Sequence, residues 1–393
     1  MRIRTTKAAG AVNQLGVGLL VMIVLLTACG GNENGANRAN GPASKTDSSG
    51  NGGGKTDGDS SGNGGVEVGG SGGDDGTNHG DKTNGTRRGD KTEEEGNDVQ
   101  GGTKERIQPE ETANAMMKGE YERLYTQFSQ ELKDAVPAAD FKAMGREFLN
   151  DVKAFREPSV LALNGMARYV WMNTEGTKSL TATYDESDTI VGIQIQNVTS
   201  HPETDEAGTK ISYGLPFKGE WLVFWGGDNE MHNYHYALES QRYAYDLVKE
   251  KDGKSYEGDR TKNESYYAFG EAMLAPADGK VAATVNDIAD NEPVGTMNSS
   301  QPAGNYVVID HGNGEYSYLA HLKKGTVKVK KGETVKKGQE IGLCGNSGNS
   351  SEPHLHFQVS DGPDLFTSKA ISVTFSGAPR MIQGDHVTGV EQR

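Results

Sequence analysis

Apolar side chains recur at helical spacing in the first ordered part of the chain and at strand spacing after it. Between Pro109 and Leu132 they fall three or four positions apart, as on one face of a helix. Pro137 then begins a second helical stretch with the same spacing. Four short apolar runs follow, and the last, Thr189 to Ile195, alternates clearly as a strand does. Helices followed by consecutive strands predict an α+β domain with an antiparallel sheet over residues 105–199.

The pattern changes after residue 200, where short β-like runs alternate with glycine-containing turns. Examples are residues 221–225, 279–285, 306–309 and 317–320. No helical periodicity of comparable length interrupts this half of the chain. We therefore predict an all-β domain with an antiparallel sheet over residues 200–380, followed by a tail over residues 381–393.

The N-terminus has the features of an export signal. Three basic residues lie within the first seven, and an apolar run from Leu15 to Leu26 follows that is short for a membrane span. Leu26-Thr27-Ala28-Cys29 resembles the lipobox of bacterial lipoproteins. That resemblance implies a signal peptide over residues 1–28 and lipidation of Cys29, which would anchor the protein to the outer face of the bacterial cell membrane. The alternative is an uncleaved anchor helix, and both place the folded part outside the cytoplasm.

Residues 29–104 consist of Gly, Asn, Asp, Ser, Thr and Lys with very few apolar side chains. Such a segment cannot bury enough apolar surface to offset the entropy of ordering, so we predict a disordered tether. A flexible chain of this length has a root-mean-square span of about 50 Å.

Charge and cysteine content narrow the function classes. The formal net charge of −15 argues against a nucleic-acid partner. The chain has two cysteines, Cys29 and Cys344. Cys344 lies in an apolar run bounded by glycines, so we expect it to be a buried core residue. We expect a monomer.

The histidines suggest where the chemistry lies. Six of the nine fall between His232 and His356. His354 and His356 are one residue apart in an apolar run, and side chains at i and i+2 leave a strand on the same face. Asp246 lies in another apolar run, where an ionised carboxylate is costly unless it is paired or bound to a metal. The alternative for Asp246 is an edge strand whose carboxylate faces water.

Several motifs in this half of the chain resemble one enzyme family. In order they are Leu274 to Val281, Val308 to Gly314, Tyr318 to Leu322, Gly332 to Gly345 and Ser347 to Phe357. Together they resemble the LytM/lysostaphin-type zinc metallopeptidases that cut peptidoglycan peptides, with similarity over about residues 221–366. The resemblance implies that Zn2+ is the cofactor, that Asp246 and His356 bind it, and that His321 and His354 are the catalytic histidines.

The first zinc ligand of that family is missing from its usual position. Four residues before Asp246 stands Arg242, and a guanidinium cannot bind zinc. The upstream candidates are His235 first and His232 second, and a site without a third protein ligand is also open. We assign His311, which precedes a Gly-Asn-Gly turn, to the scaffold.

A catalytic zinc takes three protein ligands and leaves a position for water, whose pKa it lowers. His321 and His354 would then accept the proton of that water and stabilise the oxyanion. The predicted function is a zinc-dependent endopeptidase that hydrolyses stem or cross-bridge peptides of peptidoglycan. The main alternative is a metal-free module of the same fold that binds peptidoglycan or regulates another cell-wall hydrolase.

Two further resemblances concern other parts of the chain. The α+β domain resembles the small cone-shaped domains of cystatin or NTF2-like type, for which a packing or ligand-presenting role is the default. Residues 329–339 resemble the hairpin of lipoyl or biotinyl carriers, but the modifiable lysine motif of those carriers is not evident.

Overall fold

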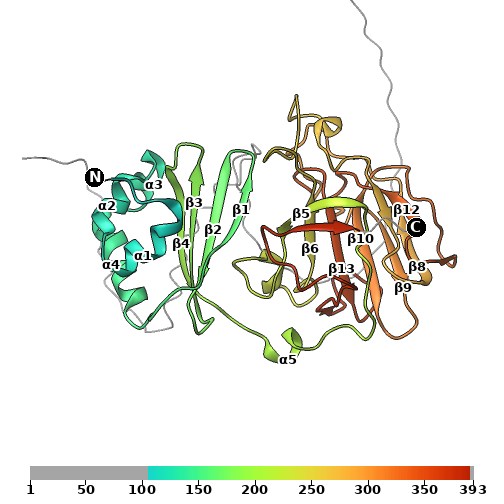
Figure 1. Ribbon diagram of the computed structural model, residues 1–393. Helices are drawn as coiled ribbons and strands as arrows, with labels where there is room; N and C mark the ends of the chain where they lie inside the picture. The colour runs from blue at the N-terminus through green and yellow to red at the C-terminus, as the bar shows by residue number, and fades with distance from the viewer. Residues whose placement is uncertain (1–104, 390–393) are drawn as a thin grey trace, which may run out of the picture. The chain divides into compact units, whose positions relative to one another are not determined.

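The computed structural model describes residues 105–389 (Figure 1). The predicted signal peptide, the lipidation site at Cys29 and the predicted tether all lie outside the described residues. Across residues 105–389, no helix is both long enough and apolar enough to cross a membrane.

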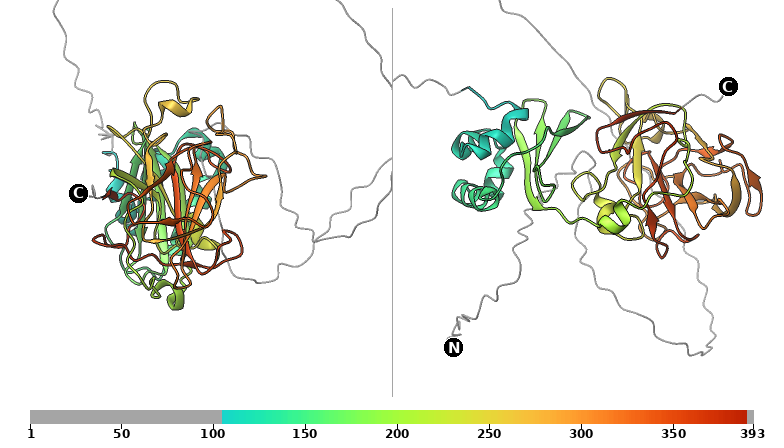
Figure 2. Two further views of the ribbon diagram at one scale, coloured as in Figure 1. Left: turned by 90° about the vertical axis from the view of Figure 1, so that its right-hand side faces the viewer. Right: turned by 60° about the horizontal axis from the view of Figure 1, so that its bottom comes forward.

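The first region of the structure consists of short helices packed on one face of a sheet (Figures 1 and 2). The helices are η1 (Pro109–Glu111), α1 (Thr112–Met117), α2 (Tyr121–Thr126), α3 (Gln130–Ala135) and α4 (Ala138–Leu149). The strands are β1 (Ser159–Leu163), β2 (Met166–Met172), β3 (Lys178–Asp185) and β4 (Ile190–Asn197). They pair antiparallel in sequence order. This is the predicted α+β arrangement, while the likeness to cystatin or NTF2-like domains stays a prediction.

The stretch from Pro109 to Leu132 is divided into several pieces rather than forming one helix. Gly119 takes a φ of +76°, which ends α1, and Phe128 pairs with Ile190 as an isolated bridge between α2 and α3. Ser129 then caps α3 by accepting a hydrogen bond from the amide of Leu132. The apolar spacing persists because the consecutive short helices face one common core.

The second region is built on a nine-stranded antiparallel sheet, as the predicted all-β class requires. The strand order is β11-β8-β9-β10-β13-β6-β5-β15, with β14 paired to β13. The strands are β5 (Gly219–Trp225), β6 (Tyr245–Val248), β8 (Gly279–Val285), β9 (Asn305–Asp310), β10 (Tyr316–Leu322), β11 (Thr334–Val335), β13 (Leu355–Ser360), β14 (Ala370–Ile371) and β15 (His386–Gly389). Since β15 pairs with β5, the sheet continues past residue 380, where the sequence predicted a tail.

Smaller elements complete this region. Strands β7 (Ala272–Leu274) and β12 (Glu340–Leu343) form a separate antiparallel pair. Three short helical turns lie in connecting segments: α5 (Pro202–Asp205), η2 (Tyr234–Ala237) and η3 (Asn263–Ser265). Their small number agrees with the predicted all-β class.

The core of this region lies against one face of the sheet and fixes which residues face the other way. In β13, Leu355, Phe357 and Val359 belong to the main apolar cluster and are fully buried. Because side chains alternate along a strand, His356 and Gln358 leave the opposite face. Cys344 is also buried in the core, and burial raises the pKa of its thiol, which confirms the expected core role.

Candidate metal centre

The candidate site lies where three neighbouring strands of the sheet meet. β13 lies between β10 and β6, and His356 pairs with Ala320 on one side and with Asp246 on the other. His354 directly precedes β13, and His321 lies near the end of β10. Strand pairing thus brings together residues that are more than 100 positions apart in the sequence.

Three buried side chains form a compact group of metal-binding donors: His235, Asp246 and His356. His356 Nδ1 lies 2.9 Å from Asp246 Oδ1, and His235 Nε2 lies 3.6 Å from Asp246 Oδ2. One ligand atom from each residue lies within 4.8 Å of the other two. The sequence predicted this set, with His235 as the first choice for the third member.

His235 reaches the group from the long loop between β5 and β6, residues 226–244, which we call the β5–β6 loop. The side chain enters from the turn η2, and the exposed fraction of His235 is 1%. His232, the second candidate, does not join the group, since its ring nitrogens contact Ser159 and Asn229. Arg242 packs on the same loop, where its Nε donates to the carbonyl of Tyr236 at 3.1 Å.

Each imidazole of the donor group is held from behind by an amide side chain. His235 Nδ1 donates to Asn233 Oδ1 at 2.9 Å, which leaves Nε2 to face Asp246. His356 Nε2 donates to Gln358 Oε1 at 3.1 Å, which leaves Nδ1 to face Asp246. Outer hydrogen bonds of this kind fix the tautomer and the ring orientation of a metal-binding histidine. Neither amide was predicted from the sequence, although Gln358 lies at i+2 from His356 on the same strand face.

His321 and His354 lie beside the donor group. Their ring centroids are 4.7 Å apart, and His354 Nε2 lies 3.7 Å from Asp246 Oδ1. His354 Nδ1 donates to the carbonyl of Glu352 at 2.8 Å, and His321 Nδ1 donates to the carbonyl of Ser347 at 2.8 Å. In the neutral form of both histidines, Nε2 is therefore the free acceptor.

Burial and mutual contact set the charge of the group. Burial raises the pKa of Asp246, but the neighbouring histidines outweigh it and leave that pKa below its usual range. Burial lowers the pKa of His235 to about 3 and the pKa of His321 well below its usual value. Both imidazoles are thus neutral near pH 7, which is the form that binds a metal or accepts a proton.

The donors present fit a zinc ion. Two imidazoles and one carboxylate match a catalytic zinc site with an open position. Zinc bonds of about 2.0–2.2 Å place two ligand atoms at most about 4 Å apart. The ligand atoms of the three residues lie within 4.8 Å of one another, so a small inward movement of the side chains would bring them to zinc-binding distances. The ring nitrogen of each ligand histidine that would not bind the metal already donates to an amide oxygen. Metal binding would therefore leave neither of these N–H groups without an acceptor.

Tyr234, which was not predicted from the sequence, forms an exposed aromatic surface next to the donor group. Its exposed fraction is 52%, and its ring centroid lies 3.9 Å from that of His235 and 5.5 Å from that of Trp225. The ring covers His235 on one side.

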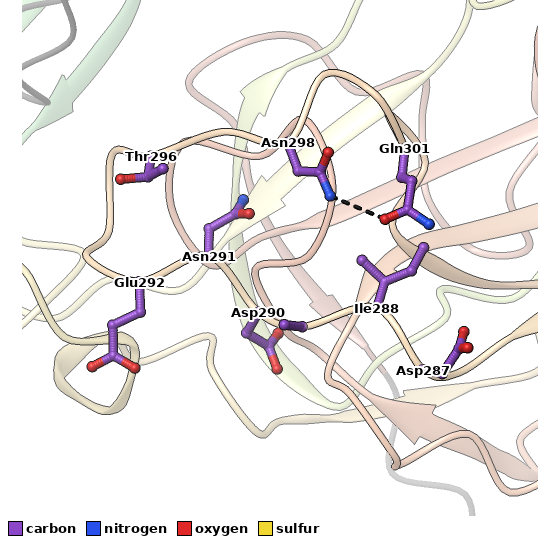
Figure 3. A pocket seen from close by; sticks show the side chains of 9 residues that line it. Asp287, Ile288, Asp290, Asn291, Glu292, Thr296, Asn298 and Gln301 are labelled. Atoms are coloured by element: carbon purple, nitrogen blue, oxygen red, sulfur yellow. Dashed lines mark hydrogen bonds between the residues drawn. The ribbon is translucent and has the colours of Figure 1, made fainter. Parts of the chain in front are cut away.

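Two other features do not belong to the donor group. His311 donates from Nδ1 to the carbonyl of Asp278 at 2.8 Å and contacts Ser317 Oγ at 2.9 Å, as expected of a scaffold residue. A polar pocket of about 400 Å³ lies over residues 287–301 (Figure 3). Its carboxylates serve local structure in part, since Asp290 accepts hydrogen bonds from the amides of Lys324 and Asn346. No histidine lines this pocket.

Residues 265–366 match the Peptidase family M23. We call this matched range, about a quarter of the chain, the M23 domain. The matched range of this M23 domain contains His321, His354 and His356, and it begins after His235 and Asp246.

Named relatives share short segments with the chain. The peptidoglycan DD-endopeptidase ShyA of Vibrio cholerae is 53% identical over 57 residues, which cover 14% of this chain and 13% of that protein. Lysostaphin of Staphylococcus staphylolyticus is 37% identical over 79 residues, which cover 20% of this chain and 16% of lysostaphin. The chain thus spans less than a fifth of the length of these two relatives.

Solved structures also resemble the chain. A zinc-containing peptidase from Vibrio cholerae is 20% identical, with 49% of this chain and 46% of that chain covered and a TM-score of 0.21. A TM-score this low adds nothing to the argument from the M23 domain.

Proposed function

We propose that this chain is a zinc-dependent endopeptidase that hydrolyses stem or cross-bridge peptides in bacterial cell-wall peptidoglycan. The M23 domain supports a peptidase, and the names of relatives such as ShyA support peptidoglycan as the substrate. The main observation is the convergence of His235, Asp246 and His356 with two further histidines at one end of three paired strands.

In this proposal His235, Asp246 and His356 hold the ion. When bound, zinc supplies Lewis-acid polarisation of the scissile carbonyl and lowers the pKa of water. Asn233 and Gln358 keep the two ligand imidazoles oriented with a lone pair directed inwards.

His321 and His354 move protons in this proposal. Each donates from Nδ1 to a backbone carbonyl, so Nε2 is the atom that accepts a proton from the attacking water. Once protonated, the same Nε2 is a donor, and it can stabilise the developing oxyanion or protonate the leaving amine. The 4.7 Å between the two rings allows both to act on one substrate bond.

We propose that the enzyme acts outside the cytoplasm, anchored to the membrane by a lipid on Cys29. The domain boundaries predicted from the sequence, 105–199 for the accessory domain and 200–380 for the peptidase domain, belong to the same proposal. In that organisation the predicted tether would separate the peptidase from the membrane surface.

The proposal is tested on the full chain by metal analysis and by digestion of purified peptidoglycan. We expect about one zinc per chain and new amino termini among the soluble products. His235→Ala should lose zinc and activity by more than the roughly 10- to 100-fold that removing an outer-shell partner costs. His386→Ala, the same substitution at an exposed histidine of β15, is the matched control and should change neither.

Three results would each contradict a part of the proposal. A purified chain that binds no zinc would identify the metal-free module instead. A zinc-loaded chain that releases no amino termini from peptidoglycan would exclude the proposed substrate. Full zinc binding in His235→Ala would mean that another residue supplies the third ligand.

A further inference from the structure

The part of the β5–β6 loop that precedes His235 is held by the α+β region. Three consecutive residues of the loop each receive a contact from a different strand. Arg168 on β2 donates to the carbonyl of Met231 at 2.8 Å. His232 Nε2 donates to Ser159 Oγ on β1 at 2.8 Å.

The third contact joins β4 to the residue before Met231. Gln196 Nε2 donates to Glu230 Oε2 at 3.0 Å. Next to these polar contacts, Leu161 and Leu163 of β1 pack with Leu222 of β5 and Val248 of β6 in one apolar cluster. The face of the sheet that is turned away from the helices therefore contacts both the β5–β6 loop and its two flanking strands.

Burying the charged side chain of Arg168 between β2 and the β5–β6 loop costs free energy. Burial lowers the pKa of its guanidinium to about 10, and the ion pairs of residues 105–389 include no carboxylate partner for it. Its hydrogen bonds go to the Met231 carbonyl and to Gln383 Oε1, and its guanidinium lies 5.5 Å from the centroid of Trp225. A cation without an ion pair at this position is best explained by the backbone that it holds.

The contacts at Met231 and His232 are linked to His235 by a continuous series of hydrogen bonds. Asn229 Nδ2 donates to His232 Nδ1 at 2.9 Å, and Asn229 Oδ1 accepts from the amides of Met231 and His232. The amide of Asn233 donates to the carbonyl of Asn229 at 3.0 Å. Asn233 Oδ1 then accepts from both the amide and the Nδ1 of His235.

We propose that the α+β region is part of the metal centre: Ser159 and Arg168 position the β5–β6 loop so that His235 faces Asp246 and His356. Both are positioning residues that act through His235 and do not contact the metal or the substrate. This gives the accessory region a function in zinc binding and explains how a histidine eleven residues before Asp246 can serve as a ligand. The inference rests on the proposed zinc site.

The experiment measures the zinc affinity of the full chain by competition with a chromophoric chelator. Ser159→Ala and Arg168→Met should each weaken zinc binding about tenfold or more, as the loss of an outer-shell partner does. Arg168→Lys should recover part of the affinity, because an ammonium can still donate to the Met231 carbonyl. The visible spectrum of the cobalt-substituted protein should also shift in both weakened variants as one imidazole ligand is loosened.

Asn164→Gly is the matched control. Asn164 makes two hydrogen bonds of 2.9 Å to Ser255, so it also joins the two regions, but it does not contact the β5–β6 loop. Glycine tolerates the φ of +53° at that position. We expect this variant to keep its zinc affinity even where its melting temperature falls as far as that of Ser159→Ala.

A double-mutant cycle separates positioning from general destabilisation. If Arg168 acts through His235, then adding Arg168→Met to His235→Ala should cause no further loss of zinc affinity. Additive losses, or unchanged affinity in both Ser159→Ala and Arg168→Met, would overturn the inference. Unchanged affinity in His235→Ala alone would instead overturn the proposed ligand set, so the two failures are distinguishable.

Discussion

His321 has a backbone conformation that residues with a side chain rarely adopt. Its φ is +61°, and the pairing of β10 with β9 shifts register between Leu319 and Leu322. Such an irregularity re-directs a side chain at the end of a strand and is common next to active sites. Here it places the His321 ring 4.7 Å from that of His354 and 5.8 Å from that of His356.

The conformation of His321 allows its chemistry to be tested without disturbing the fold. Asparagine tolerates a positive φ better than other residues with a side chain. His321→Asn should therefore keep the melting temperature and the zinc content of the wild type, yet lose at least about 100-fold in peptidoglycan cleavage as a proton acceptor is removed. His321→Asn activity near that of the wild type would show that His354 alone moves the proton.

At the residue scale, the sequence predicted the donors better than their supports. Asp246 and the His354/His356 pair stand out because a carboxylate and imidazoles in apolar strands need a partner. Asn233 gives no such signal, since an asparagine in a loop is ordinary. Its role depends on a fold of the loop that leaves it fully buried and bonded to His235 Nδ1.

At the scale of the element, the β5–β6 loop should make stability depend on pH. Burial, with a smaller contribution from Arg168, lowers the pKa of His232 to about 4, while Asp228 acts in the opposite direction. Below pH 6.5 the unfolded chain binds a proton at His232 that the folded chain does not. Stability from this residue is therefore present above pH 6.5 and is lost as the pH falls towards 4.

The measurement is urea unfolding of the zinc-free protein at several pH values between 7.5 and 4. As the pH falls over this range, the free energy of unfolding of the wild type should decrease by up to about 3 kcal/mol more than that of His232→Gln. The glutamine cannot titrate, and its amide can still donate to Ser159. Parallel pH dependences of the two proteins would show that His232 is not held in its neutral form.

The elements themselves were predictable where one face is buried and irregular where a tertiary contact intervenes. The four strands of the first sheet lie close to the predicted runs because alternation along a strand directly reports burial. The break at Phe128 could not be predicted from spacing, because it depends on a bridge to Ile190, 62 residues later in the sequence. The position of β15 likewise depends on pairing with β5.

At the scale of the whole molecule, the sequence indicated two folded regions but not their dependence on each other. Composition and periodicity report what each region buries within itself. The contacts of Arg168 and Ser159 with the β5–β6 loop join polar residues that are unremarkable in isolation. The proposed role of the first region in the metal centre could therefore be inferred only from the three-dimensional arrangement.

Lipidation of Cys29 would determine where the molecule acts. If Cys29 is lipidated, the wild-type chain should sediment with membranes, resist extraction by high salt and be released by detergent, because a buried acyl chain contributes about 0.8 kcal/mol per methylene. Cys29→Ser should not be lipidated at that position and should not incorporate a radiolabelled fatty acid. Cys344→Ser is the matched control, since that thiol is buried in the core and should not affect labelling. Labelling that persists in Cys29→Ser would exclude the lipobox, and membrane retention without any label would identify the apolar run from Leu15 to Leu26 as an uncleaved anchor.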